Sequence, residues 1–183
     1  MSPLDDATLF LVNTLFGLYG YAMIARVLVQ SSRGDFYNPL AQSIWRVTNP
    51  VSQPAQRVIP RWRRWDLASI VVLWLLLMLN IAIDLLLLDT HLGANVPWFA
   101  LLKVGVMVLT FYTFAILILA VMSWFGAAMH SPAASLLHTV TNPLLRPVRA
   151  RIPPIGGLDL SPLLVILVLQ VLARLLPLPY VLR

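Results

Sequence analysis

The sequence predicts an all-α membrane protein with four transmembrane helices, arranged as two tandem helix–loop–helix repeats with short interfacial amphipathic helices in the loops. Hydrophobic residues make up 60% of the chain and charged residues 11%, with a mean hydropathy of +0.84, whereas about a quarter of the residues of a soluble domain are charged. Residues 47–50 (Val-Thr-Asn-Pro) recur at 140–143, and nine of the 21 residues at positions 47–67 are identical to the residue 93 positions later. Identity at a fixed spacing indicates two copies of one structural unit.

Four apolar stretches are candidates for membrane-spanning helices, which need about 20 residues. They cover residues 9–29, 67–88, 97–124 and 162–176. We therefore assign the first repeat to residues 1–88, an outer connection to residues 89–96 and the second repeat to residues 97–183. Acidic residues and no basic ones precede the first stretch, and no small-residue cleavage site follows it, so we expect it to be retained as an anchor.

The distribution of arginine predicts the orientation. Two crossings per repeat return the chain to the side on which it started, so both motif loops are expected on one face of the membrane. Nine of the 13 basic residues lie in these loops: Arg33, Arg46, Arg57, Arg61, Arg63, Arg64, Arg146, Arg149 and Arg151. Because loops rich in Lys and Arg stay in the cytoplasm, we expect both loops to be cytoplasmic and both termini to lie outside.

Asn-Pro and Ser-Pro pairs mark predicted helix starts. Asn and Ser side chains accept the free N–H groups of a helix N-terminus, and proline fits the first helical position because it has no N–H. The pairs begin at Asn38, Asn49, Ser131, Asn142 and Ser161. The helices after Asn38 and Ser131 are apolar on one side and too short to span, so we expect them to lie in the headgroup plane.

The segments that follow the repeated Asn-Pro pairs are harder to predict. Pro54 and Pro147 fall past the first turn of residues 50–59 and 143–152, where a proline removes a backbone hydrogen bond and clashes with the preceding turn. A kinked helix or a partly extended stretch is expected in each loop, at the membrane surface.

The end of the second loop contains a predicted reversal. Pro153 ends the preceding segment, and Gly156 and Gly157 supply the positive φ angles of a tight turn. Asp159 then precedes the Ser161-Pro162 pair that opens the last span. Its carboxylate is favoured by the dipole of that helix by about 0.3–1 kcal/mol, or it pairs with an arginine of the same loop.

Two interpretations of the loop arginines stand. They are either the charge that fixes orientation or a docking surface for anionic lipid headgroups or a partner protein, since each base near an anionic surface contributes about 1 kcal/mol. The repetition of loop prolines as well as charge favours docking. The candidate docking and motif residues are Asn49, Pro50, Pro54, Arg57, Pro60, Asp66, Asn142, Pro143, Arg146, Pro147, Arg149, Arg151, Pro153, Gly156, Gly157, Asp159, Ser161 and Pro162.

No catalytic constellation is recognisable, so we expect a protein that is not an enzyme and has no cofactor, no metal site and no nucleic-acid partner. The chain has no cysteine and three histidines without partners at ligand spacing. Charged residues in the spans fall near the span ends, where long side chains reach the interface: Arg26, Asp84, Lys103 and Arg174. For polar residues nearer the middle, such as Asn80, interhelical hydrogen bonding is the commoner use. Gly17 and Gly20 leave room for a close helix neighbour or reflect ordinary variation.

In these motifs the chain resembles the YggT family of small integral membrane proteins. The similarity covers Phe-Tyr-Asn-Pro-Leu at residues 36–40, residues 49–60, Ser-Trp at 123–124, and residues 141–162 with their Pro-Pro-Ile-Gly-Gly-Leu-Asp-Leu-Ser-Pro core. The chain departs from the family pattern in the Arg-Ala-Arg order at residues 149–151 and in Ser131.

The resemblance implies a multi-pass protein of the bacterial inner membrane. The family is associated with osmotic-stress tolerance in bacteria, and plastid and cyanobacterial relatives with cytochrome b6 haem attachment or with division and nucleoid organisation. We therefore expect a role in osmotic-stress tolerance or in ion or envelope homeostasis. The alternatives are an assembly factor for another membrane protein and a small oligomeric channel. Expected partners are anionic membrane lipids, a membrane protein or further copies of the chain.

Overall fold

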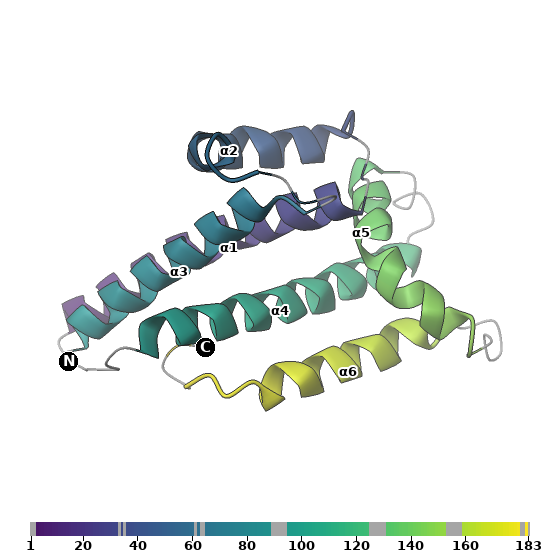
Figure 1. Ribbon diagram of the computed structural model, residues 1–183. Coiled ribbons are helices and arrows are strands. Elements are labelled where there is room, and N and C mark those ends of the chain that lie inside the picture. The colour runs from purple at the N-terminus through teal and green to yellow at the C-terminus, as the bar shows by residue number, and fades with distance from the viewer. Residues whose placement is uncertain are drawn as a thin grey trace.

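The computed structural model describes residues 3–32, 34, 36–60, 62, 65–88, 95–124, 131–152, 159–179 and 182, which form six helices (Figure 1). The helices are α1 (Pro3–Ser31), α2 (Pro39–Gln56), α3 (Leu67–Leu87), α4 (Val96–Trp124), α5 (Pro132–Arg149) and α6 (Ser161–Leu175). The described part contains no β-strand, only an isolated antiparallel bridge between Trp62 and Trp65. The prediction of an all-helical fold is confirmed.

The helices recur at the spacing of the sequence motifs. α4 and α5 begin and end 93 residues after α1 and α2, respectively. α6 starts one residue later than this spacing and is shorter, with 15 residues against the 21 of α3. Pro177 stands at the position equivalent to Asp84 of α3. Because proline disfavours a helical conformation in the residue before it, α6 ends where α3 continues.

The six helices pack as two similar sets (Figure 1). α1 lies beside α3 with α2 packed against both, and α4 lies beside α6 with α5 packed against both. α1 begins and α6 ends at the same end of the bundle. The side-chain amide of Asn38, just before α2, donates to the carbonyl of Pro132 at the start of α5 over 2.7 Å, so α2 and α5 are linked directly.

Apolar side chains occupy both the interior and the outer surface of the bundle. The larger buried cluster joins α1, α3 and α4 around Met23, Leu77 and Met107, and a smaller one joins α4, α5 and α6. Many large apolar side chains of the long helices remain exposed, among them Leu15, Leu79, Phe114, Ile118 and Leu167. Contiguous exposed apolar surface of this kind is unfavourable in water and is typical of a protein in a bilayer.

Three of the predicted spans meet the length and composition of a membrane-crossing helix: α1, α3 and α4. α6 is a shorter apolar helix. Its 15 residues extend about 22 Å at 1.5 Å per residue, against about 30 Å for a hydrocarbon core.

The loop helices correct part of the sequence interpretation. The starts after Asn38 and Ser131 are confirmed: Asn38 accepts the N–H groups of Leu40 and Ala41 at 2.9 and 3.4 Å, and the Ser131 hydroxyl accepts that of Ala134 at 3.2 Å. α6 starts at Ser161 itself, so this serine does not cap it.

The predicted helix starts after Asn49 and Asn142 are wrong. α2 runs unbroken through Pro50 and Pro54, and α5 does the same through the equivalent prolines. Each proline leaves one carbonyl of the preceding turn without an intrahelical donor, and all four prolines are exposed.

Candidate functional site

The repeated motif of the first copy forms a buried polar network where α1, α2 and α3 meet. Arg26 of α1 is 2% exposed, and its Nη1 donates to Thr48 Oγ1 over 2.9 Å and to Asn49 Oδ1 over 2.7 Å. Its Nε lies 3.7 Å from Oδ2 of Asp66, which directly precedes α3. The Asn49 side chain therefore bonds to a side chain of another helix and not to the backbone of its own.

Asp66 is held from several directions. It is 1% exposed and caps α3, accepting the N–H of Ser69 at 3.3 Å and its hydroxyl at 2.7 Å. The amide of Gln56, at the end of α2, also donates to its carboxylate. A buried charge pair is tolerated only when hydrogen bonds satisfy its remaining atoms. This network therefore fixes the position of α2 on the two long helices.

The sequence predicted that the Arg26 side chain would reach the membrane interface, whereas the structure buries it between helices. The signal was present in part, because a charged residue inside an apolar span needs a partner within the protein. The duplicated Thr48, Asn49 and Asp66 are such partners, but nothing in the linear sequence shows which face of α1 they meet.

The second copy keeps the threonine, asparagine and aspartate of this network but has an apolar residue in place of the arginine. Leu119 stands at the position equivalent to Arg26, and Leu145 at that of Ser52. Both leucines are buried in an apolar cluster with Ile116, Val165 and Leu169. A cavity of about 550 Å³ opens beside this cluster between α4, α5 and α6.

The duplicated aspartate of the second copy is paired at the surface. Arg149 stands where the first copy has Gln56, and its Nε donates to Asp159 Oδ2 over 2.8 Å. Asp159 Oδ1 accepts the backbone N–H of Ser161 at 2.9 Å. Partial burial acts to raise the pKa of Asp159, but the bonds from Ser161 and Arg149 outweigh it and hold that pKa below its usual value. Of the two roles predicted for Asp159, at the helix start and as a partner of arginine, the structure shows both.

The other predicted site residues divide between surface and interior. The exposed ones are Pro50, Pro54, Arg57, Pro60, Pro143, Arg146, Pro147 and Arg151. Ser161 is buried, and Asn142 and Pro162 are half-buried. Pro153, Gly156 and Gly157, with the predicted reversal, lie outside the described residues. The structure thus places the charged motif residues of α2 and α5 outward, and the polar motif residues of the first copy inward.

The arrangement is suited to holding helices together and to presenting charge. In the described part of the chain, no three His, Asp or Glu residues are grouped closely enough to hold a metal ion. Five exposed arginines lie on α2, on α5 or within two residues of their ends: Arg46, Arg57, Arg146, Arg149 and Arg151.

Comparison with known proteins identifies the family. The family described as CCB3/YggT matches residues 6–87 and again residues 98–180. The uncharacterized protein PA0392 of Pseudomonas aeruginosa is 34% identical over 176 residues, which is 94% of this chain and 89% of that protein. The uncharacterized protein YggT of Escherichia coli K12 is 35% identical over 164 residues, covering 89% of this chain and 85% of that protein. No solved structure matches. With two matching segments that together span most of its length, this chain belongs to the CCB3/YggT family.

Proposed function

We propose that this protein is a non-enzymatic component of the bacterial inner membrane whose helices α2 and α5 form a cytoplasmic docking surface for anionic lipid headgroups or a membrane protein. Through this surface it supports osmotic-stress tolerance or ion and envelope homeostasis. The osmotic role rests on the family. The docking role rests on one structural observation, the outward placement of arginine along two linked helices.

The exposed side of these helices combines charge with apolar surface. On α2, Arg46 is exposed beside Val47 and Val51, which are 56% and 41% exposed. Trp62 and Trp65, in the segment after α2, are also largely exposed. Arginine, valine and tryptophan together suit the boundary between headgroups and acyl chains. The buried residues of α2 are small or polar, namely Ala41, Thr48 and Ser52, so the exposed Val47 and Val51 are available for contact with lipid.

The proposed topology has four crossings, with α6 as the fourth. α6 packs along α4, and α1 begins at the end of the bundle where α6 ends. The short length of α6 is compensated by the apolar residues that follow it, or by local thinning of the bilayer. Because the chain has no cysteine, single cysteines introduced at Arg57, Arg151 and Trp98 test this topology without background labelling. Labelling of the first two only from the cytoplasm, and of the third only from outside, is expected. Loops on opposite sides would refute the proposal.

Docking is tested by replacing Arg146, Arg149 and Arg151 with glutamine. The protein is reconstituted in a mixture of phosphatidylglycerol and phosphatidylethanolamine, and the lipids that remain bound after mild extraction are quantified by mass spectrometry. We expect the glutamine variant to lose the enrichment in phosphatidylglycerol. A matched lysine variant, which keeps the charge but not the bidentate guanidinium, should retain most of it. Equal enrichment in the wild type and the glutamine variant would leave only the orientation role for these arginines.

The cellular role is tested by deleting the gene and shifting external osmolarity. Impaired growth after the shift, restored by the wild type and not by the glutamine variant, is the expected result. Unchanged growth with lost cytochrome would favour the assembly-factor alternative. Ion flux through liposomes that contain the purified protein would favour the channel.

A further inference from the structure

A second polar cluster lies far from the docking surface, at the end of the bundle where α1 begins and α3 ends. Lys103 of α4 donates to Asn80 Oδ1 over 2.7 Å, Asn80 donates to Asn13 Oδ1 over 3.1 Å, and Asn13 donates to Asp84 Oδ1 over 2.9 Å. The bonds form one chain from a cation to a carboxylate through two amides. The expected interhelical role of Asn80 is thereby observed, whereas Asp84 is 1% exposed and does not extend to the interface as its position near a span end predicted.

The cluster is not part of the duplicated plan. Residues at the equivalent positions of the other copy are Phe10 for Lys103, Val106 for Asn13, Ala173 for Asn80 and Pro177 for Asp84. Thus none of the four polar positions has a polar counterpart. The packing of a helix pair in this fold does not require them, because the second pair packs without them.

One atom of the cluster has no donor among the described residues. Asp84 Oδ2 is buried and forms no hydrogen bond with any described residue. Leaving a buried carboxylate oxygen unpaired is costly. Lys103 offsets the charge of Asp84 but is bonded to Asn80, on the far side of the two amides, and does not reach this oxygen.

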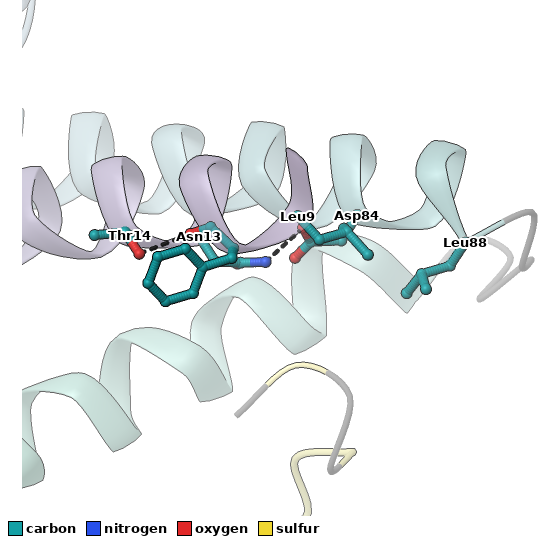
Figure 2. Close-up of a pocket in the computed structure, with 6 residues that line it drawn as sticks. Leu9, Asn13, Thr14, Asp84 and Leu88 are labelled. Atoms are coloured by element: carbon teal, nitrogen blue, oxygen red, sulfur yellow. Dashed lines mark hydrogen bonds between the residues drawn. The ribbon is translucent and has the colours of Figure 1, made fainter. Parts of the chain in front are cut away.

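The residue that carries this oxygen lines a cavity that is open at the surface, where Phe10, Asn13 and Thr14 are exposed. Asp84, Asn13 and Thr14 line a space of about 440 Å³ together with the apolar side chains of Leu9, Phe10 and Leu88 (Figure 2). Figure 2 shows the Asn13 side chain directed at Asp84, with Thr14, the next residue of α1, beside it. The volume is many times the roughly 30 Å³ of one water and lies within the range of small-molecule sites.

We propose that this cavity binds a primary alkylammonium group, with Asp84 Oδ2 as its anionic acceptor. An ammonium has three N–H donors and no acceptor, so it supplies the donor that the carboxylate lacks. Asn13 Oδ1 and Thr14 Oγ1 provide further acceptors, and Phe10 adds an aromatic side chain, of a kind that attracts cations, to the lining.

The other possible cations fit this cavity less well. A desolvated metal ion such as Ca²⁺ or Mg²⁺ needs about six or more oxygens, whereas three polar side chains line the cavity. The apolar side chains of the lining suit the hydrocarbon part of an amine. Two sources carry this chemistry: the ethanolamine headgroup of a phospholipid and a free amine in solution. Asp84 lies three residues before the end of α3, or about 5 Å along the helix axis, so a headgroup at the membrane surface is within reach.

The test uses the full chain in nanodiscs of phosphatidylcholine, whose quaternary ammonium has no N–H. In one arm, phosphatidylethanolamine is added and the number of retained molecules is measured by native mass spectrometry. In the other, ethylammonium chloride is titrated and its binding is followed by thermal unfolding, with sodium chloride at equal ionic strength as the reference. Binding in the first arm alone identifies a lipid ligand, and binding in the second shows that free amines also enter. Both support the proposal.

Three variants make the result specific. Asp84→Asn keeps the shape of the side chain and removes its charge, and should weaken binding by about tenfold or more, the effect of losing one hydrogen bond to a charged group. Leu88→Trp fills the cavity without touching the polar chain and should have the same effect. Asp6→Asn removes an exposed carboxylate of α1 that does not line the cavity, and should bind like the wild type. Absence of binding to the wild type in both arms, equal binding by Asp84→Asn, or equal stabilisation by sodium would overturn the proposal.

Discussion

Replacing Arg26 with leucine, the residue that the second copy has at this position, tests the buried network directly. The substitution removes two hydrogen bonds, of 2.9 and 2.7 Å, and the ion pair with Asp66. The two side chains of that pair are 3% and 0% exposed, so solvent cannot replace the lost cation. Removing one partner of a buried pair costs about 3–5 kcal/mol, and we expect Arg26→Leu to lower the free energy of unfolding by that amount.

The measurement is unfolding in mixed micelles with increasing dodecyl sulfate, followed by tryptophan fluorescence and circular dichroism. Arg46→Leu removes an exposed arginine of α2 and serves as the control, with an expected change within about 0.5 kcal/mol. In the double variant Arg26→Leu/Asp66→Asn neither charge remains unpaired, so its loss should be smaller than the sum of the single losses by about 1–3 kcal/mol. An Arg26→Leu protein as stable as the control, or strictly additive losses, would show that the network does not hold α2 in place.

Three further predictions follow from the packing. The Arg149–Asp159 pair is 38% and 40% exposed, so Arg149→Gln should cost only about 0.2–1 kcal/mol. Because the folded pKa of Asp159 is lowered, the stability that this carboxylate contributes should be present above about pH 4 and lost as the pH falls through the folded pKa. The measurement is a pH series of unfolding midpoints, and identical series for the wild type and Arg149→Gln would contradict this prediction. Gly20→Leu should cost about 1–3 kcal/mol, because a Cβ at this position already lies 2.9 Å from the terminal methyl of Met107 and 3.7 Å from Leu73, so a longer side chain must displace both. A Cβ at Gly17 has no neighbour within 4 Å, so Gly17→Leu should cost less than Gly20→Leu. Asn38→Ala removes the cap of α2 and the bond to α5, and is expected to cost about 1–2 kcal/mol and to speed amide hydrogen exchange at both helix starts; faster exchange in α2 alone would argue against the link.

The sequence was sufficient to predict the helices, because each prediction rested on a local signal. Apolar runs marked α1, α3, α4 and α6, and Asn38 and Ser131 marked the true starts of α2 and α5 by capping. The same signal failed at Asn49. An Asn-Pro pair has the same sequence whether the asparagine oxygen accepts a hydrogen bond from a neighbouring backbone N–H or from a distant guanidinium. Pro177, which ends α6, could have been used to predict a fourth segment shorter than the second.

The buried polar residues could not be predicted from local signals. Arg26, Asp84 and Lys103 all lie within a few turns of a helix end, where a side chain that reaches the interface and one that turns into the protein have the same sequence context. Which of these occurs depends on the rotation of each helix about its axis and on its neighbours. Comparison of residues 93 positions apart could have indicated these sites. A charged residue in one copy that is equivalent to an apolar residue in the other marks a position where the two halves differ.

The exchange of Arg26 for Leu119 has a mechanical consequence. A guanidinium that bonds two side chains of α2 fixes that helix in a single register on its neighbours, since hydrogen bonds are lost over shifts of about 1 Å. The leucine contacts of α5 have no such directional requirement and lie beside a cavity, so the directional contacts of α5 are those near its two ends, the Asn38–Pro132 hydrogen bond and the Arg149–Asp159 pair. The middle of α5 should therefore tolerate small changes in packing of a size that would break the hydrogen bonds of Arg26 in the first half.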